Sequence, residues 1–167
     1  VDNEGNVTNY NLQNTNNILD TNDNVVGLVT DITGNLWGTK SNSSYPLFCK
    51  SLNDNWYSFN MPFVANESTK IGEIIVDDSG QKWGIITGNG IFVYNDNNTI
   101  NNISDDQFLK ITTSEGNGNL SHNEVYSIAN DLNGNIWVGT KSGVCVFYSP
   151  SSIFSGYNFD AQQIIVE

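Results

Sequence analysis

The chain has 167 residues, which is enough for one globular domain with a packed core. Its formal charge of −12 comes from 18 acidic residues against 6 lysines, and such a charge disfavours binding to nucleic acid or to anionic lipid surfaces. No apolar run reaches the roughly 18 residues that a membrane-spanning helix needs, so we expect no direct membrane insertion.

The composition indicates an all-β protein. Asparagine occupies 28 positions, beside 15 glycines and 3 prolines, and this mixture favours tight turns. No window of about 12 residues shows helical periodicity. The residues after Val1 resemble the middle of a structure rather than a leader, so we expect a mature chain or a piece of a longer one. Cys49 and Cys145 lie in short apolar runs and are predicted to be free, buried thiols.

Three segments repeat one pattern, D-x-x-G-[NQ]-x-W, within residues 27–39, 73–85 and 127–139. The repeated aspartates lie 46 and then 54 residues apart, from 31 to 77 and from 77 to 131. A repeat of about 50 residues with strand-like runs is typical of β-propeller blades, which are four-stranded antiparallel sheets. An aspartate, a glycine and a tryptophan align in all three repeats, and we predict that they form a structural repeat motif: Asp31, Gly34, Trp37, Asp77, Gly80, Trp83, Asp131, Gly134 and Trp137.

Each repeat predicts the same strands in the same order. An apolar run before the aspartate, such as 71–76, predicts a buried inner strand. The D-x-x-G step predicts a hairpin turn, in which the aspartate accepts backbone N–H groups and the glycine takes a positive φ. The tryptophan opens the second strand; we expect its ring to pack between blades, and its indole N–H needs an acceptor. Third strands are predicted at 46–52, 90–95 and 143–149, and outer strands at 54–60 and 107–112.

The whole chain, 1–167, is predicted to be a single propeller segment with blade repeats at 16–60, 61–113 and 114–160. Residues 1–15 are expected to end a preceding blade, with 4–12 as its outer strand, and residues 161–167 to form a closing strand or the first strand of a next blade. Propellers have about four to eight blades, so three cannot close a ring. We therefore expect other blades of the same parent protein, or another copy of the chain, as partners. The isolated chain is expected to self-associate through its open sheet edges.

The repeated aspartates have a second interpretation as calcium ligands, because Asp131, Asn133 and Asn135 echo the start of a calcium-binding loop. Ser142 stands where such a loop carries its bidentate glutamate. We therefore favour turn capping, and we predict no metal and no cofactor.

No group of residues predicts catalysis. The chain has no arginine, so it lacks the arginine cluster with which sialidases bind a carboxylate. His122 is the only histidine and is expected in a polar turn, and its adjacency to Ser121 does not make a triad. The acid pairs 77–78 and 105–106 lie in a repeat turn and beside an outer strand, where a glycosidase pair is not expected. We predict no catalytic residues and a protein that is not an enzyme.

The connections 41–46, 62–70, 95–102 and 114–123 are polar and rich in asparagine, glycine or serine. We expect them to gather on one face around a central channel and to form the ligand or partner surface. The sequence does not identify individual ligand-binding residues.

The motif D-x-x-G-N-[LI]-W-[VG]-G-T-x-x-G-V, best seen at 131–144, resembles the two-component regulator propeller repeat of Bacteroidetes. The first repeat departs from it by lacking the residue between Trp37 and its glycine, and the second reads Trp83-Gly-Ile-Ile-Thr. Residues 78–83 also resemble the Asp-box of sialidases, which is a structural hairpin. The segment 143–167 is similar to the one that follows such repeats in PorZ-like surface proteins of the type IX secretion machinery.

This resemblance implies an exported location, in the periplasm or at the outer-membrane surface, and a propeller without catalysis. It implies envelope proteins or a glycan as partners. Three functions stay open: a binding or scaffolding propeller of the envelope, the periplasmic oligosaccharide-sensing domain of a hybrid two-component histidine kinase, and a propeller glycosidase or lyase.

Overall fold

The computed structural model describes residues 4–20, 22–61, 64, 66 and 68–164. Over these residues the chain forms three four-stranded antiparallel sheets and one short 3-10 helix. The predicted fold class, all-β with three propeller blades, is confirmed. None of the described residues belongs to a helix that is long and apolar enough to cross a membrane.

The strands follow the chain from the inside of each blade to its outside. The first sheet contains β1 (Asn24–Thr30), β2 (Leu36–Ser41), β3 (Leu47–Lys50) and β4 (Trp56–Phe59). The second contains β5 (Ile71–Val76), β6 (Lys82–Ile86), β7 (Ile91–Asn95) and β8 (Gln107–Ile111). The third contains β9 (Val125–Asn130), β10 (Ile136–Thr140), β11 (Gly143–Phe147) and β12 (Gln162–Ile164), with the 3-10 helix η1 (Pro150–Ser152) between the last two strands.

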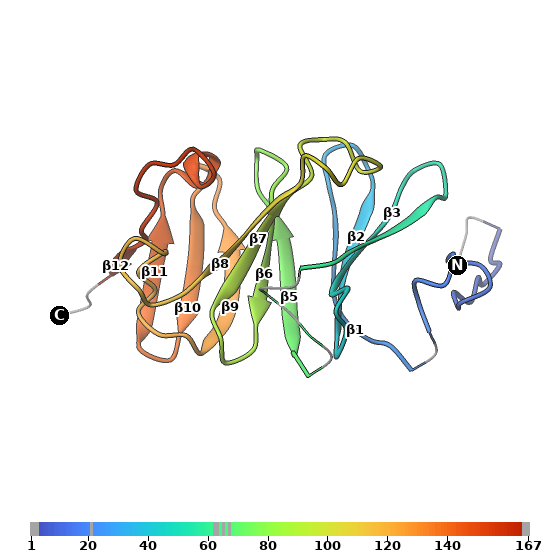
Figure 1. Ribbon diagram of the computed structural model, residues 1–167, viewed down its shortest axis with the longest axis horizontal. Coiled ribbons are helices and arrows are strands. Elements are labelled where there is room, and N and C mark those ends of the chain that lie inside the picture. The colour runs from blue at the N-terminus through green and yellow to red at the C-terminus, as the bar shows by residue number, and fades with distance from the viewer. Residues whose placement is uncertain (1–3, 21, 62–63, 65, 67, 165–167) are drawn as a thin grey trace.

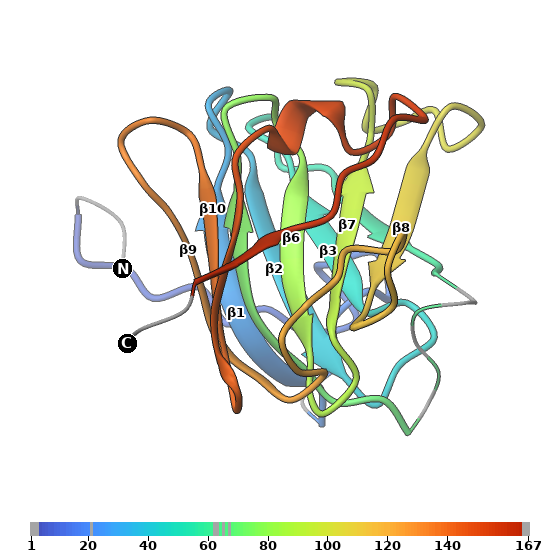
Figure 2. The same cartoon turned by 90° about the vertical axis from the view of Figure 1, so that its left-hand side faces the viewer.

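The three sheets stand side by side with their faces against one another (Figure 1). Viewed along this stack, they lie one behind another (Figure 2). The inner strand of each sheet contacts the inner strand of the next, so β5 touches both β1 and β9. Strand β2 also contacts β5, and β6 contacts β9. This stacking of inner strands is the arrangement of consecutive propeller blades.

Two layers of buried side chains fill the gaps between the sheets. The layer between the first and second sheets includes Trp37, Leu47, Phe59, Ile74 and Phe92. The layer between the second and third sheets includes Trp83, Ile91, Val93, Ile128 and Phe147. Because strand residues alternate between the two faces of a sheet, the middle sheet supplies one row of side chains to each layer.

Residues 4–12 form no strand, so the predicted outer strand of a preceding blade is wrong. The chain turns back on itself at 12–17, where Asn16 and Asn17 take positive φ angles of 55° and 60°. Asparagine tolerates this left-handed conformation better than most residues. Residues 4–12 therefore have no neighbouring strand with which to pair.

The same segment covers the outer part of the free face of the first sheet. The ring of Tyr10 packs edge-on against Trp56, with centroids 5.1 Å apart, and Ile18 clusters with Phe48 and Trp56. Lys40 Nζ donates to the backbone oxygen of Ile18 at 2.6 Å. A short irregular segment thus occupies part of the place that a preceding blade would take.

Strand β12 comes from the segment 161–167 and pairs antiparallel with β11. It is the outer strand of the third sheet. Residues 165–167 lie outside the described part of the chain. The blade boundaries predicted from the sequence stay predictions.

Candidate binding surfaces

The repeat turns join each aspartate to the tryptophan six residues later. In the first turn, Asp31 Oδ1 accepts the backbone N–H groups of Thr33 and Asn35, both at 2.9 Å, and Oδ2 accepts the indole N–H of Trp37 at 2.8 Å. The glycine of this turn, Gly34, has a φ of 86°, which a side chain would strain. The predicted turn geometry is therefore present.

The other two turns repeat this geometry. The indole N–H groups of Trp83 and Trp137 each donate to Oδ2 of their aspartate at 2.9 Å. Backbone N–H groups donate to Oδ1 of both aspartates, as in the first turn. In the described part of the chain, no three His, Cys, Asp or Glu side chains form a group that could hold a metal ion. We propose that the aligned aspartates, glycines and tryptophans of the three repeats are structural.

The second turn differs from the others in one hydrogen bond. Asn35 and Asn135 each donate a side-chain N–H to Oδ2 of their aspartate at 2.9 Å. The equivalent Gln81 gives Asp77 only its backbone N–H, and Gln81 Oε1 is buried without a partner. The added methylene of glutamine displaces the amide from the carboxylate.

The pKa values of the three carboxyls follow this difference. Burial raises the pKa of Asp31, but hydrogen bonds from Trp37 and Asn35 outweigh it and hold the pKa at about 2. The pKa of Asp131 is also about 2, owing to the hydrogen bonds from its tryptophan and asparagine. Burial dominates at Asp77 and raises its pKa above the ordinary value despite the hydrogen bond from Trp83.

The tryptophans of the first two repeats are sealed between sheets. Trp37 is 0% exposed and packs against Phe59 of its own sheet and Tyr94 of the next, at centroid distances of 5.3 and 6.1 Å. Trp83 is also 0% exposed and packs against Phe147 of the third sheet at 5.2 Å. Trp137 is 38% exposed, because no sheet follows the third one in the structure.

One face of the third sheet therefore has no sheet against it. The pairing of β9 to β12 places one row of side chains on it, which we call the Trp137 face: Ser127, Ala129, Trp137, Gly139, Val144, Val146, Gln162 and Ile164. None of these side chains carries a charge. The equivalent rows of the first and second sheets are the buried layers between blades.

A buried ion pair of the second sheet faces the first sheet. Lys82 Nζ lies 2.6 Å from Asp96 Oδ1, and both side chains are almost fully buried. The same ammonium group lies 3.9 Å from the centre of the Trp37 ring, as in a cation–π contact. Sequence reasoning missed this group, although Lys82 stands in the column of the apolar residues Leu36 and Ile136.

The polar connections do not all share one edge of the sheets. The segments 41–46 and 114–123, and the described part of 62–70, follow second or outer strands. The segment 95–102 follows the third strand β7 and lies at the opposite edge, with the D-x-x-G turns (Figure 1). The prediction was wrong for this segment, because antiparallel strands alternate in direction, so connections after first and third strands emerge at the same edge.

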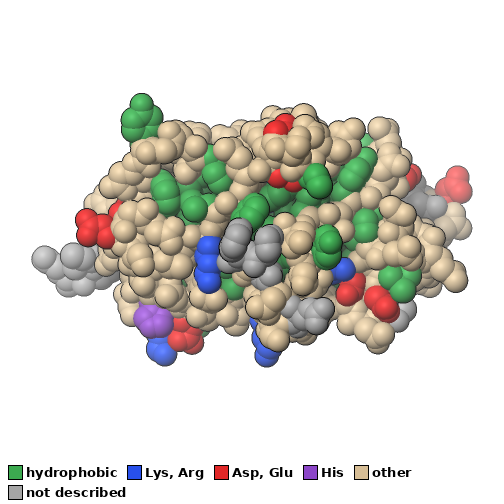
Figure 3. All heavy atoms as spheres, in the orientation of Figure 1, with side chains coloured by type: hydrophobic (Ala, Val, Ile, Leu, Met, Phe, Trp, Pro, Cys, Tyr) green, Lys and Arg blue, Asp and Glu red, His purple; other side chains and the backbone are tan. Residues whose placement is uncertain are grey.

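His122 lies in a half-buried turn at the edge that carries 114–123. Its Nδ1 accepts the backbone N–H of Glu124 at 2.9 Å, and Glu124 pairs with Lys141 at 2.9 Å. Figure 3 shows the histidine beside basic and acidic side chains at the edge of the molecule. Ser121 hydrogen-bonds to Thr140 at 2.7 Å rather than to the histidine.

The acid pairs are also tied to local structure. Tyr94 donates its hydroxyl to Asp106 at 2.5 Å, and Thr99 Oγ1 lies 2.9 Å from Asp105 Oδ2. The two cysteines are free and buried, as predicted. Burial raises the pKa of the Cys49 thiol to about 12 and raises that of Cys145 as well.

Comparisons with known proteins agree with this architecture. The family model described as "Two component regulator propeller" matches residues 119–142, which span the third repeat turn. No curated protein matches the chain by sequence.

Solved structures match most of the chain. PorZ, described as an essential bacterial surface component of the type IX secretion system of Porphyromonas gingivalis, is 29% identical with a TM-score of 0.72. The match covers 83% of this chain and 20% of PorZ, so the chain spans about one fifth of that protein. The extracellular domain of a putative hybrid two component system from B. thetaiotaomicron is 21% identical with a TM-score of 0.58, over 94% of this chain and 19% of the other.

Virginiamycin B lyase from Staphylococcus aureus shares the fold at 13% identity and a TM-score of 0.59, over 96% of this chain and 46% of the lyase. This likeness concerns the fold alone. The chain is thus an all-β propeller segment that matches the two component regulator propeller model at residues 119–142 and is similar over most of its length to part of PorZ.

Proposed function

We propose that the chain is a non-catalytic binding and scaffolding segment of a larger β-propeller in an exported bacterial envelope protein. The observation that supports this most is the similarity to PorZ, at 29% identity over 83% of the chain. Because PorZ is a surface component of a type IX secretion system, we extend a role in that secretion, or in cell-surface attachment, to this protein. Its place is then the periplasm or the outer-membrane surface.

The partners follow from the surface of the chain. The Trp137 face is uncharged. The equivalent side chains of the first and second sheets pack against the sheet that follows each of them, so we propose that a further blade of the same parent protein covers the Trp137 face. Envelope proteins or a glycan would bind elsewhere on the propeller. A chain with a formal charge of −12 has no electrostatic attraction for nucleic acid.

We also propose that this segment does not catalyse a reaction. The candidate base and nucleophile hold local structure instead: His122 accepts the backbone N–H of Glu124, and Ser121 bonds to Thr140. Glycan binding without turnover in a product assay agrees with this proposal. Release of a cleaved glycan that depends on a residue of this chain would overturn it.

The location and role can be tested together in the bacterium that makes the protein. We expect an epitope-tagged full-length protein to be digested by external protease, and deletion of its gene to reduce secreted or surface-attached proteins. A matched deletion of an unrelated envelope protein is the control. A tagged protein that stays in the cytoplasm, or a deletion strain with normal secretion and attachment, would contradict the proposal.

A second function is the periplasmic oligosaccharide-sensing domain of a hybrid two-component histidine kinase. The family match at 119–142 and the likeness to an extracellular two component domain favour it. The complete gene separates the two functions. A transmembrane helix followed by kinase motifs identifies a sensor, whereas a gene without them supports the surface protein.

A further inference from the structure

The two interfaces between the sheets share one aromatic contact. In each, the ring of a repeat tryptophan meets an aromatic side chain from the end of the next sheet's third strand. Tyr94 of β7 packs on Trp37, with ring centroids 6.1 Å apart. Phe147 of β11 packs on Trp83, with centroids 5.2 Å apart. Aromatic pairs at such distances attract one another beyond the burial of their area, so the following sheet gives each tryptophan a specific partner.

The two aromatic side chains have the same position in their blades. Tyr94 and Phe147 each pair with the residue that directly precedes the repeat tryptophan of their own sheet. This pairing places both side chains on the face that points toward the preceding sheet. Lys50 has the same position in the first sheet, because it pairs with Leu36. The first sheet therefore presents a cation where the other two present an aromatic ring.

Lys50 makes the first sheet of a second copy a poor cover for the Trp137 face. In the arrangement of the two existing interfaces, Lys50 of that copy would lie against Trp137. Its ion-pair partner is Asp54, whose side chain is 81% exposed. A sheet packed against this pair would remove water from both charges, which is costly.

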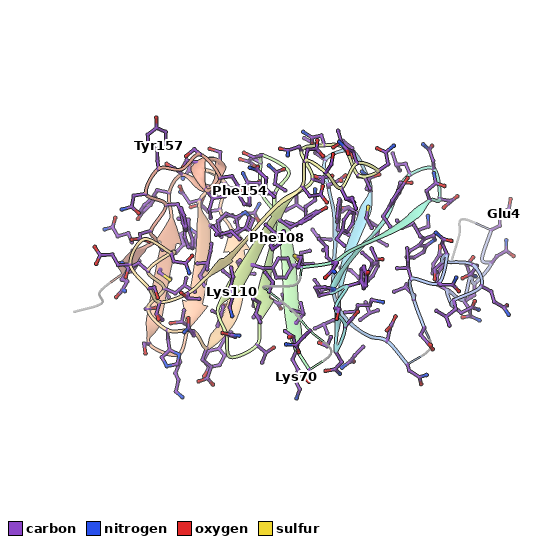
Figure 4. All side chains as sticks on the ribbon, viewed as in Figure 1. Glu4, Lys70, Phe108, Lys110, Phe154 and Tyr157 are labelled. Carbon is purple, nitrogen blue, oxygen red and sulfur yellow. The ribbon has the colours of Figure 1, made fainter. Side chains whose placement is uncertain are left out.

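The N-terminal segment obstructs the same face of the first sheet. The ring of Tyr10 packs on Trp56 there, and Ile18 clusters with Phe48 and Trp56. Figure 4 shows Glu4 at this end of the stack, beyond the first sheet. A second copy would have to displace this segment before its Trp137 face could reach the outer part of the first sheet.

The Trp137 face also has smaller side chains than the equivalent rows of the other two sheets. Three positions show this, each given with its equivalents in the first and second sheets: Ala129 for Val29 and Ile75, Gly139 for Thr39 and Ile85, and Val144 for Leu47 and Ile91. Protein interiors are packed without large gaps. A sheet that covers the Trp137 face must therefore bring larger side chains than the sheets that cover the other two rows.

From these contacts we propose that the Trp137 face is covered by a blade of the same polypeptide whose third strand ends in an aromatic side chain that packs on Trp137, with bulky apolar side chains opposite Ala129 and Gly139. This inference rests on the proposed role as a segment of a larger propeller and specifies the covering blade. The first sheet of a second copy does not fit this description. Two isolated copies can still bring their Trp137 faces together, because each face then offers the other a tryptophan ring.

The structure of the full-length protein tests the identity of the covering blade. We expect an aromatic ring from another blade of the same polypeptide against Trp137, at a centroid distance like the 5.2 and 6.1 Å of the two existing interfaces. An aliphatic or charged side chain in that place, any sheet of a second copy, or a Trp137 face open to water overturns the inference.

Thermal unfolding tests the size of the covering side chains. Ala129→Ile should lower the melting temperature of the full-length protein by a few degrees, because the larger side chain overpacks the covered face. It should leave the isolated chain unchanged at a concentration where that chain is monomeric, because Ala129 is exposed there. Asn130→Ile is the matched control, since this exposed neighbour lies on the opposite face, where the second sheet is already present.

The comparison between the two proteins decides this part of the inference. An equal shift in the full-length protein and the isolated chain, or no shift in the full-length protein, overturns the predicted fit. Such results leave the proposed envelope role standing, because surface location and secretion are measured separately.

Discussion

The sealed gaps between the sheets and the open Trp137 face carry the same repeat motif in opposite surroundings. Trp37 and Trp83 are 0% exposed, whereas Trp137 is 38% exposed, although all three indoles donate to the aspartate of their own turn. The turn is therefore made within one blade and does not need a neighbour. Burial of the tryptophan ring does need a neighbouring blade, because the ring is fully buried only where another sheet packs against it.

The two sealed gaps also differ from each other. The interface between the first and second sheets contains the buried Lys82–Asp96 pair beside Trp37, while none of the other ion pairs among the described residues lies between the second and third sheets. A buried pair is weak evidence for stability, but it opposes any arrangement that leaves one charge unpaired. The interface between the first and second sheets is thus more selective for its partner sheet than the interface between the second and third sheets.

The largest expected effect comes from removing a sealed tryptophan. Trp83→Ala should destabilise the chain by about 3–5 kcal/mol, because it leaves a cavity in a closed layer. Trp137→Ala should cost roughly half as much or less, because part of its ring is already in water. Urea unfolding of both variants measures the comparison, with the exposed Tyr157→Ala as control. Equal losses at the two tryptophans would contradict the contrast between sealed and open faces.

The next effect concerns the buried ion pair. Lys82→Leu alone should destabilise the chain by about 3–5 kcal/mol, because Asp96 is left buried without its cation. The double variant Lys82→Leu/Asp96→Leu should recover most of this loss. The exposed pair of Lys141 and Glu124 is the control, since Lys141→Leu leaves Glu124 in water and should change stability far less than Lys82→Leu. A single Lys82 variant as stable as the parent would show that the pair has no role in the interface.

A smaller effect is expected in the second repeat turn. Gln81→Asn should place an amide N–H on Asp77, as in the other two turns, and stabilise the chain by about 1 kcal/mol. It should also lower the pKa of Asp77, because the carboxylate gains a donor. The reverse change, Asn135→Gln, should destabilise the third turn. Thermal unfolding and NMR titration measure both variants, and a Gln81→Asn protein of lower stability would count against this explanation.

The smallest effect is a pH dependence of stability. Asp31 and Asp131 have pKa values of about 2 in the folded chain, below the ordinary value of 3.8. Their contribution is fully present above the unfolded pKa and is lost as the pH falls toward 2. Asp77 has a raised pKa and changes stability in the opposite direction, because its ionisation above the unfolded pKa is unfavourable in the folded chain. Stability measured from pH 5 to 2 should therefore fall less in Asp31→Asn than in the parent, and an unchanged slope would refute the assignment.

Much of the fold could be predicted from the sequence, because the residues of each repeat motif form their turn through contacts with one another. The Asp–Gly–Trp spacing encodes a turn and two strands, and the sequence placed all three inner strands correctly. The failures occurred where spatial neighbours decide the outcome. Residues 4–12 were predicted to be an outer strand but have no strand beside them, and the 95–102 connection was assigned to the wrong edge by composition alone.

The candidate surfaces were less predictable than the fold. Lys82 could have been noticed as a charge in an otherwise apolar column, but its partner Asp96 lies after the next strand and gives no local signal. The connection 148–161 folds onto the third sheet, where Ile153 joins the buried layer, and no repeat pattern encodes that. Sequence patterns thus identified the shared scaffold and missed the features that occur in one blade only.

The central claim is that the Trp137 face is built to pack against another sheet, and the association state of the isolated chain tests it most directly. Sedimentation velocity over a range of concentrations should compare the parent chain with Trp137→Lys, which places a charge on the open face, and with the control Tyr157→Lys. We predict that the parent and the control associate as concentration rises, and that Trp137→Lys stays monomeric with an unchanged fold by circular dichroism. A parent chain that remains a compact monomer at every concentration, or one that associates equally well with Lys at position 137, would contradict the claim.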